Sequence, residues 1–240
     1  MGKLERYCLE PDRWLSGVLS RPAWRVVEGA SGTPLEAIRA GKPQFATAKV
    51  PASDPALVGE LEQLGFHVVD AALTFAAEDL PPAAASPAVR FAAPGDRGPV
   101  EAVAGSAFRY SRFHLDPRFP RELADRIKAQ WAGNWFLGQR GDGMIVAEDG
   151  GRVAGFLQLL RGRDGPLVID LIAVEERSRG RGLARAMIAH AAAHGTGDGR
   201  RTAGMIVGTQ AANVPSVRLY ESLGFRLRDA QFVLHHHGEP

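Results

Sequence analysis

PLVIDLIAVEERSRGRGLARAMIAHAAAH, the stretch from Pro166 to His194, combines three local patterns that together indicate one kind of binding site. An apolar run over Leu167–Val174 predicts a buried strand. A basic turn containing two glycines follows over Arg177–Gly182, and the apolar spacing from Leu183 onward predicts a helix. A glycine-rich turn between a strand and a helix N-terminus offers unpaired backbone N–H groups and the positive end of the helix dipole. The stretch therefore predicts a phosphate site, although an ordinary arginine-rich turn would show the same residues.

Composition excludes several classes of protein. The chain has 240 residues, 45% of them hydrophobic, which is enough for one large core or two small ones. Its net charge of +2 and its scattered arginines, despite a sequence pI near 8.9, do not favour nucleic-acid binding. Cys8 is the single cysteine, so no internal disulfide and no cysteine-based metal cluster is expected, and no metal site is predicted. The lack of a signal-peptide pattern and of a long apolar run predicts a cytoplasmic protein that does not enter a membrane.

A change in composition predicts two domains. Proline and alanine dominate Leu80–Val89, which is typical of a linker, and we place the boundary near residue 85, between domains over 1–85 and 86–240. The elements expected after it are a strand over Val89–Ala92, a helix from Gly95 to Phe108, a helix over Pro120–Phe136, a hairpin of Met144–Glu148 and Arg152–Leu160, the strand and helix quoted above, a strand over Gly204–Thr209, a helix over Asn213–Leu223 and a strand over Phe225–Leu234.

An internal repeat connects the two halves. Leu61–Phe75 (LEQLGFHVVDAALTF) aligns without a gap to Tyr220–Leu234 (YESLGFRLRDAQFVL), with six identical positions in fifteen. Both copies predict the end of a helix, a glycine and a strand. The N-terminal half therefore resembles a degenerate copy of the closing unit of the C-terminal half, although L-G-F after a helix is a common ending and the match could be coincidence.

Two motifs carry a resemblance to a known family. Arg177, Gly180 and Gly182 supply R-x-x-G-x-G, and NVPSVRLYESLGF over Asn213–Phe225 matches N-x-x-[SA]-x-x-x-Y-x-x-x-G-F. With the order of expected elements, residues 88–234 resemble the GNAT N-acetyltransferases. The resemblance implies an α+β fold with a mixed sheet, a smaller and degenerate GNAT-like domain before it, and an enzyme that uses acetyl-CoA.

The resemblance also implies how acetyl-CoA is held. The loop and the first turn of the following helix would bind the pyrophosphate, the end of the preceding strand would polarise the thioester carbonyl through a backbone N–H, and Asn213 would bond the pantetheine arm. The implied cofactor-binding set is Ile172, Ala173, Val174, Arg177, Arg179, Gly180, Arg181, Gly182, Leu183, Ala184, Asn213 and Ser216.

Two residues are candidates for proton transfer. By resemblance, the Tyr220 phenol donates a proton to the leaving sulfur, although a tyrosine on such a helix is also typical of core packing. Asp170 interrupts an apolar strand, and burial there would suit a general base. The alternative for Asp170 is a carboxylate bonded to a backbone amide or an arginine. Glu148, His114 and an ordered water are the other candidates for the base.

The acceptor is predicted from GSAFRYSRFHLDP over Gly105–Pro117 and the WAGNWF run from Trp131. These segments resemble the GNAT subgroup that acts on nucleotide-linked amino-deoxy sugars, typified by the dTDP-fucosamine acetyltransferases. Arg112 and Arg118 would clamp a diphosphate, with His114 beside them, although Arg112 and His114 could equally be surface residues. The expected reaction is direct attack of the sugar amine on the thioester. Acetylation of a protein or another small amine, and a non-catalytic acyl-CoA-binding module, are the alternatives.

Two further expectations concern the ends of the chain. His235, His236 and His237 are adjacent, so on a strand they would point in alternating directions and could not alone form a tetrahedral metal site. We expect them to lie in a disordered tail. For the N-terminal half we consider two roles, shaping of the acceptor site and contact with a second copy in a homodimer.

Overall fold

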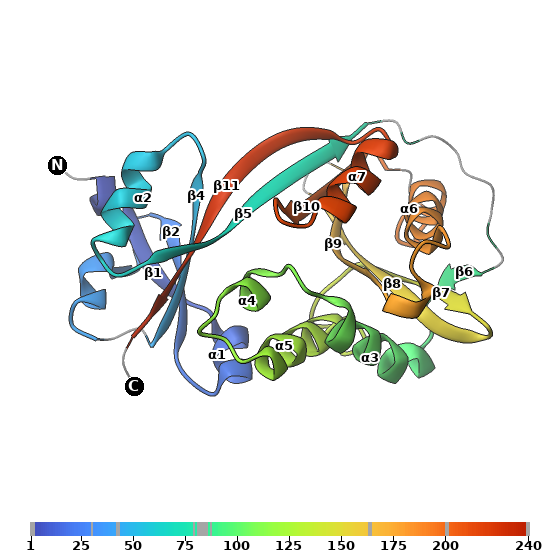
Figure 1. Ribbon diagram of the computed structural model, residues 1–240, viewed down its shortest axis with the longest axis horizontal. Helices are drawn as coiled ribbons and strands as arrows, with labels where there is room; N and C mark the ends of the chain where they lie inside the picture. Colours follow the sequence, from blue (N-terminus) through green and yellow to red (C-terminus); the bar gives the residue numbers. More distant parts are fainter. Residues whose placement is uncertain are drawn as a thin grey trace. The chain divides into compact units, whose positions relative to one another are not determined.

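The computed structural model describes residues 3–29, 31–41, 44–78, 80, 86, 88–162, 165–199 and 202–238 (Figure 1). The predicted boundary near residue 85 lies outside the described residues, so the division into 1–85 and 86–240 stays a prediction. By its internal contacts the chain forms two compact units. The first comprises Met1–Leu73, Gln210–Ala212 and Asp229–Pro240, and the second comprises Thr74–Thr209 and Asn213–Arg228.

The first unit is a sheet with short helices. Its sheet order is β3-β1-β2-β4-β11-β5, and β2 runs parallel to β4 while β1 is antiparallel to both of its neighbours. Leu9, Val50, Leu57 and Leu61 belong to its buried core. The elements are η1 (Lys3–Arg6), β1 (Tyr7–Pro11), α1 (Arg13–Leu19), β2 (Ala23–Glu28), β3 (Thr33–Pro34), η2 (Leu35–Ile38), β4 (Phe45–Pro51), α2 (Pro55–Glu62), most of β5 (His67–Ala77) and most of β11 (Arg226–His237).

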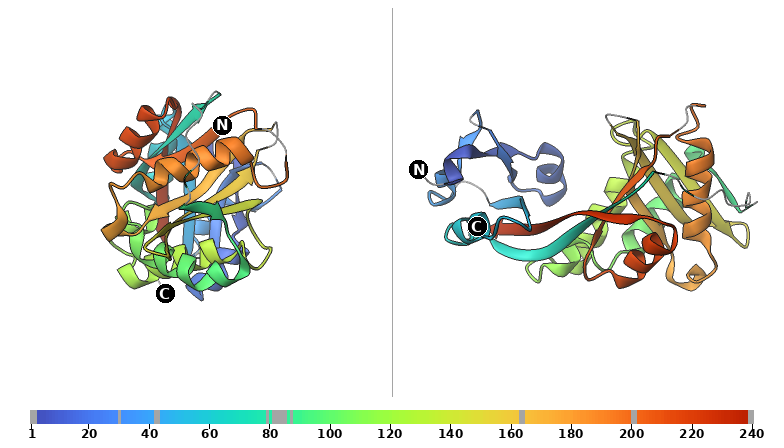
Figure 2. Two further views of the ribbon diagram at one scale, coloured as in Figure 1. Left: turned by 90° about the vertical axis from the view of Figure 1, so that its right-hand side faces the viewer. Right: turned by 90° about the horizontal axis from the view of Figure 1, so that it is seen from above.

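The predicted internal repeat is present in the structure. Gly65 follows α2 with φ +86°, and Gly224 follows the last C-terminal helix with φ +88°. In both copies the next residue is a buried phenylalanine, Phe66 or Phe225, whose N–H donates to the carbonyl five residues back, at 3.1 and 3.0 Å. Each copy then continues into a long strand, and these strands, β5 and β11, are neighbours in the sheet (Figures 1 and 2).

The expectation of a disordered histidine tail is wrong. β11 extends through His237, and His235, His236 and His237 pair with Thr47, Ala46 and Phe45 of β4. His235 is fully buried, with its ring edge-on to Phe45 at 4.9 Å between centroids. The sequence did not reveal this because the pairing strand lies in the N-terminal half of the chain.

The second unit has the element order that the sequence predicts, with three additional short helices among the described residues, α4 and the 3-10 helices η3 and η4. Its elements are β6 (Val89–Phe91), η3 (Pro94–Asp96), α3 (Arg97–Ala107), α4 (Arg112–Leu115), α5 (Arg121–Gly133), β7 (Gly143–Asp149), β8 (Arg152–Arg161), β9 (Leu167–Val174), η4 (Glu176–Ser178), α6 (Leu183–His194), β10 (Met205–Gln210, its last residue in the first unit) and α7 (Val214–Ser222). None of the described helices is long and apolar enough to cross a membrane.

The sheet of the second unit has the order β10-β9-β8-β7-β6 and is covered by helices (Figure 1). β9 is parallel to β10 and antiparallel to β8, so the sheet is mixed. α3 and α5 pack on one face through Val100, Val103, Ala104 and Ala132, against Phe156, Leu171 and Ala173 of the strands. The β9–α6 connection follows the carboxyl end of β9, an interior strand of this sheet.

Candidate active site

Two parallel strands of the second unit, β9 and β10, separate along their length. β10 pairs with β9 from Leu167 to Ile169, and within the described residues it makes no further pairs with β9. β8, in contrast, follows β9 as far as Val174. The side of β9 that faces β10 is therefore unpaired over its last residues. These include Ile172, Ala173 and Val174, the strand end that the sequence analysis expects to polarise the thioester carbonyl.

The loop between β9 and α6 exposes a run of backbone donors. Gly180 and Gly182 both have φ of +77°, a conformation that favours glycine, and Gly182 begins α6 without a side-chain cap. Within the described part of the chain, none of the N–H groups from Gly180 to Arg185 donates a hydrogen bond; the N–H of Ala186 is the next along, and it donates to the Gly182 carbonyl at 2.9 Å. Unpaired donors at a helix N-terminus attract an anion.

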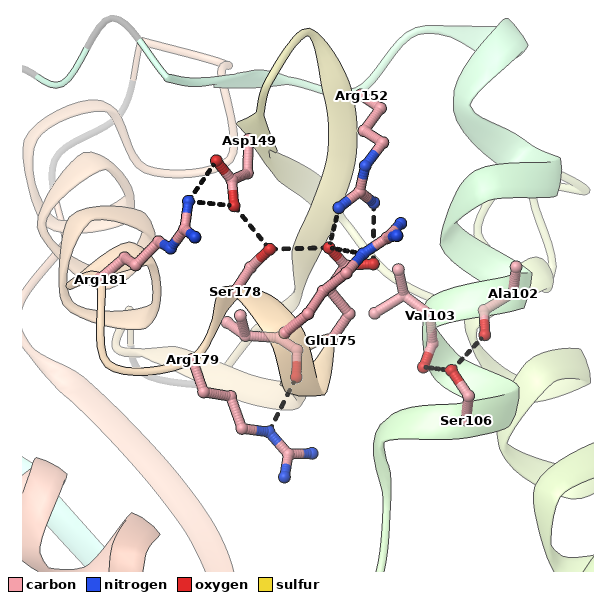
Figure 3. Close-up of polar contacts among 11 residues, drawn as sticks. Ala102, Val103, Ser106, Asp149, Arg152, Glu175, Ser178, Arg179 and Arg181 are labelled. Atoms are coloured by element: carbon pink, nitrogen blue, oxygen red, sulfur yellow. Dashed lines mark hydrogen bonds and ion pairs between the residues drawn. The ribbon is translucent and has the colours of Figure 1, made fainter.

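Charged side chains fix this loop to the β7–β8 hairpin (Figure 3). The buried Ser178 hydroxyl lies 2.7 Å from Oδ2 of Asp149 and 2.7 Å from Oε1 of Glu175, and it donates to one of them at a time. Arg152 forms a bidentate ion pair with Glu175. The hydrogen bonds from Arg152 hold the pKa of the Glu175 carboxyl far below its usual range. Because both ends of the loop are tied to strands, the glycine backbone between them is held in place.

The three arginines predicted to bind the cofactor also bond within the loop region. Arg177 pairs with Glu175 at 3.1 Å, and Nη1 of Arg181 lies 2.9 Å from both carboxylate oxygens of Asp149. Arg179 donates to the carbonyls of Val174 and Ala107, at 3.2 and 2.8 Å. These contacts shape the loop, and its unpaired backbone amides are donors for an anion.

Tyr220 and Asn213 lie on α7 as the motif predicts. The side chain of Asn213 caps α7 by accepting from the N–H of Ser216 at 3.4 Å. Tyr220 is 2% exposed, and its ring lies near Phe75 and Phe225 at 6.2 and 5.7 Å between centroids. Burial raises the pKa of Tyr220, and its hydroxyl makes no hydrogen bond within the described residues. The phenol therefore keeps its proton at neutral pH.

Asp170 occupies a bulge in β9. Gln158 pairs with Leu171 and Leu159 pairs with Ile169, so Asp170 is skipped in the register with β8, although its Oδ2 accepts from Nε2 of Gln158 at 3.3 Å. The bulge turns Asp170 toward the face that α5 covers, where it accepts from Nε1 of Trp131 at 2.9 Å. Arg140 binds both carboxylate oxygens, at 2.6 and 2.7 Å. These contacts correspond to the ion-pair alternative of the sequence analysis.

The residues predicted to bind the acceptor are in different environments. The His114 ring is buried and bonded at both nitrogens, to Ser111 at 2.6 Å and to Asp125 at 2.9 Å, so the alternative that it is a surface residue is wrong. Burial lowers its pKa, against the opposing effect of Asp125. Arg112 lies over the Phe113 ring at 4.7 Å, and Arg118 is exposed after α4. Their contact with an acceptor stays a prediction.

The comparison with known proteins identifies this arrangement. The profile of the GNAT family of acetyltransferases matches residues 108–225, a stretch that contains the splayed strands, the loop and Tyr220. These residues form a GNAT acetyltransferase domain. Beyond it, the chain is 34% identical over 142 residues to the spore coat polysaccharide biosynthesis protein SpsD of Bacillus subtilis, which matches 59% of this chain and 48% of SpsD. The chain thus spans about half the length of this curated relative.

Solved structures show the same fold at low sequence identity. A GCN5-related N-acetyltransferase from Kribbella flavida has a TM-score of 0.58 at 16% identity, covering 91% of this chain and 82% of its own. A tandem GNAT protein from the clavulanic acid biosynthesis pathway has a TM-score of 0.54 at 15% identity, covering 91% of this chain and 76% of its own. The α+β GNAT fold predicted from the sequence is confirmed.

A pocket of about 550 Å³ in the second unit adjoins the loop, between α3 and the β7–β8 hairpin. Arg90 lines it and bonds Asp96 at 2.7 Å and Glu148 at 2.8 Å, while Arg152 and Arg177 reach Glu175 on its other side. Glu148, one of the alternative bases, is therefore paired with an arginine. The sequence analysis did not predict that Glu175 and Arg152 anchor the loop. The only indication in the sequence is that these two residues carry opposite charges, one directly after β9 and one at the start of β8.

We expect the Glu175→Gln variant of the GNAT domain to bind acetyl-CoA about tenfold more weakly, because the loop loses its charged anchors and must be ordered on binding. Calorimetric titration with acetyl-CoA measures this. Glu10→Gln, which removes an exposed ion pair with Arg25, is the matched control and should bind as the parent does. Equal affinities in all three proteins would show that the anchors do not support the loop.

Proposed function

We propose that this chain transfers an acetyl group from acetyl-CoA to the amino group of a nucleotide-linked amino sugar, in a cytoplasmic reaction without a metal. The observation that carries acetyl-CoA use is the run of unpaired amides from Gly180 to Arg185, beside the open side of β9. A pyrophosphate needs several donors at close range, and glycine lets the backbone approach it. The residues present therefore fit the cofactor that the family uses.

The residues divide the chemistry between them. Acetyl-CoA supplies the acetyl group as an activated thioester. The Gly180–Arg185 amides hold the pyrophosphate, and an unpaired N–H among Ile172, Ala173 and Val174 polarises the thioester carbonyl. The acceptor nitrogen forms its bond to the carbonyl carbon as the carbon–sulfur bond breaks. Tyr220 gives its proton to the departing sulfur, and the proton that the nitrogen loses passes to an ordered water, the remaining candidate for the base. Asn213 and Ser216 at the start of α7 contact the pantetheine arm.

For Asp170 we expect a positioning role, because Arg140 and Trp131 already occupy its carboxylate. Asp170→Asn should lower kcat/KM about tenfold, since the hydrogen bonds to Arg140 and Trp131 weaken while the geometry is kept. The shape of the pH–rate profile should be unchanged. Steady-state kinetics from acidic to alkaline pH measure this. Loss of the acidic limb together with a hundredfold fall in kcat would instead make Asp170 the general base.

The sugar acceptor rests on two observations. SpsD belongs by name to the biosynthesis of a spore coat polysaccharide, and Arg112 and Arg118 lie in and directly after α4, on the segment that the sequence analysis assigns to the acceptor. Guanidinium groups bind diphosphates through paired hydrogen bonds. The acceptor that we propose is therefore a small molecule. We also propose that the N-terminal half contacts a second copy of the chain in a homodimer.

A thiol-release assay tests this function. The purified chain is mixed with acetyl-CoA and nucleotide-linked 3-amino- or 4-amino-6-deoxyhexoses, and free amino sugars, polyamines and peptides are the comparison set. We expect release with a sugar nucleotide and product with one additional acetyl group by mass spectrometry. Release with peptides or polyamines alone would overturn the sugar assignment. Tight acetyl-CoA binding without any turnover would favour the non-catalytic module.

A further inference from the structure

Lys128 of α5 is a buried cation to which the mechanism above gives no role. Lys128 is only 8% exposed. Its ammonium nitrogen lies 4.8 Å from the centroid of the Phe108 ring and 4.9 Å from that of the Trp131 ring. Within the described part of the chain it makes no hydrogen bond and no ion pair. Lysines so deeply buried are almost always paired. The three N–H donors of this ammonium thus have no acceptor among the described residues.

The charged groups around Lys128 are mostly cationic. Arg112 and His114 of α4, Arg140 of the loop after α5 and Asp170 of β9 are the titratable or charged groups that interact with it. Burial lowers the pKa of Lys128 to about 8, Arg112 and Arg140 act in the same direction, and Asp170 opposes them. Asp170 already accepts from Arg140 and Trp131. The single acid in this group is therefore committed elsewhere.

A structural role does not account for the ammonium. The two aromatic faces stabilise a cation, but they accept no hydrogen bond in place of a carboxylate or water. A methionine would fill the same space between Phe108 and Trp131 without the cost of burying a charge. We therefore expect the ammonium to bind a group that is not part of the folded chain. An anion matches its positive charge and its three N–H donors.

We propose that Lys128, held between Phe108 and Trp131 beside the Asp170 bulge, binds an anionic group of the acetyl acceptor. The group is a phosphate or a carboxylate. Its assignment to the acetyl acceptor rests on the proposed acetyl transfer, whereas the anion site itself does not depend on that function. Trp131 links this ammonium to Asp170 through a 2.9 Å hydrogen bond, so the anion lies next to the part of β9 where the thioester is placed. Lys128 then selects acceptors by charge.

Calorimetric titration tests the site without turnover. The probes are thymidine diphosphate and glucuronate, which separate a nucleotide phosphate from a sugar carboxylate. In Lys128→Met we expect the affinity for one of them to fall about 10- to 100-fold, because a charge-assisted hydrogen bond is lost, while acetyl-CoA affinity is kept. Lys128→Arg should retain most of the binding. Lys49→Met, at an exposed lysine of β4, is the matched control.

The melting temperature distinguishes an anion-binding role of Lys128 from a packing role, because the two roles predict changes of opposite sign in Lys128→Met. The pKa of Lys128 is lowered on folding, so the unfolded chain binds the extra proton between about pH 8 and 10 and stability rises with pH in that window. Lys128→Met should therefore melt higher than the parent near pH 7, and the difference should shrink toward about pH 10. A lower melting temperature at pH 7 would identify Lys128 as a packing residue and overturn the proposal.

Kinetics separate the remaining outcomes. If acetyl transfer occurs, Lys128→Met should raise KM for the acceptor while kcat changes little. Unchanged KM with a lost alkaline rise in kcat would make Lys128 a general base and overturn the anion site. Unchanged binding of both probes would overturn it as well. If no acceptor is acetylated but a probe binds through Lys128, the anion site stands and the proposed function fails.

Discussion

Acetyl-CoA binding should fall by about 100-fold or more when Gly180 is replaced by glutamate, because several charge-assisted hydrogen bonds are lost and a carboxylate enters the phosphate site. No atom lies within 4 Å of a Cβ built on Gly180, so the side chain fits without a clash. Its carboxylate would stand in front of the unpaired amides from Gly180 to Arg185 and repel the pyrophosphate. Calorimetric titration with acetyl-CoA gives the affinity directly.

The matched control for this variant is Gly199→Glu. Gly199 has φ of +73° against +77° for Gly180, is exposed, and also has open space around a built Cβ. The two variants therefore share the backbone strain, of about 1–2 kcal/mol, that a side chain meets at positive φ. We expect Gly199→Glu to bind acetyl-CoA as the parent does. If both variants lose binding equally, the loss comes from folding and the loop assignment is wrong.

The second large effect is expected at Tyr220. Tyr220→Phe should lower kcat about 100-fold or more, because the leaving sulfur then lacks its proton donor. Acetyl-CoA affinity and the melting temperature should stay close to those of the parent, since the buried ring keeps its contacts with Phe75 and Phe225. The hydroxyl has no hydrogen-bond partner among the described residues that the change would strand.

Tyr7→Phe, in β1, is the control for the general loss of a phenol. Pre-steady-state measurement of thiol release under single-turnover conditions separates the chemical step from product release. A Tyr220→Phe enzyme with a normal rate in that experiment would show that another group or a water protonates the sulfur. The fold and the acetyl-CoA site would be unaffected by that result.

The strand, loop and helix of the phosphate site could be predicted because their signals are local. The strand over Leu167–Val174 and the helix over Leu183–His194 have the bounds that the sequence indicates. Apolar runs, positive-φ glycines and a missing cap each depend on a few adjacent residues. The Asn213 cap and the hairpin turn at Gly150 and Gly151, with φ of +62° and +77°, follow from equally local chemistry.

The surroundings of Asp170 and Lys128 could not be predicted, because they depend on contacts distant in sequence. Strict alternation along β9 would place Asp170 and Leu171 on opposite faces, whereas the bulge brings Asp170 to the side of Trp131. Its ion-pair partner Arg140 is thirty residues away in sequence. Lys128 lies at a polar position of an amphipathic helix, and the rings of Phe108, from the segment after α3, and Trp131 lie against its ammonium.

The most direct test of the account is whether acetyl-CoA contacts the Gly180 and Gly182 amides. In protein labelled with ¹⁵N-glycine, NMR resolves the glycine amides, and Gly180→Ala and Gly182→Ala assign the two signals of interest. On addition of acetyl-CoA we expect both amide protons to shift strongly downfield, as donors to phosphate oxygens do, while the exposed Gly138 and Gly199 signals stay in place. Unmoved signals for Gly180 and Gly182 at saturating acetyl-CoA would contradict the account.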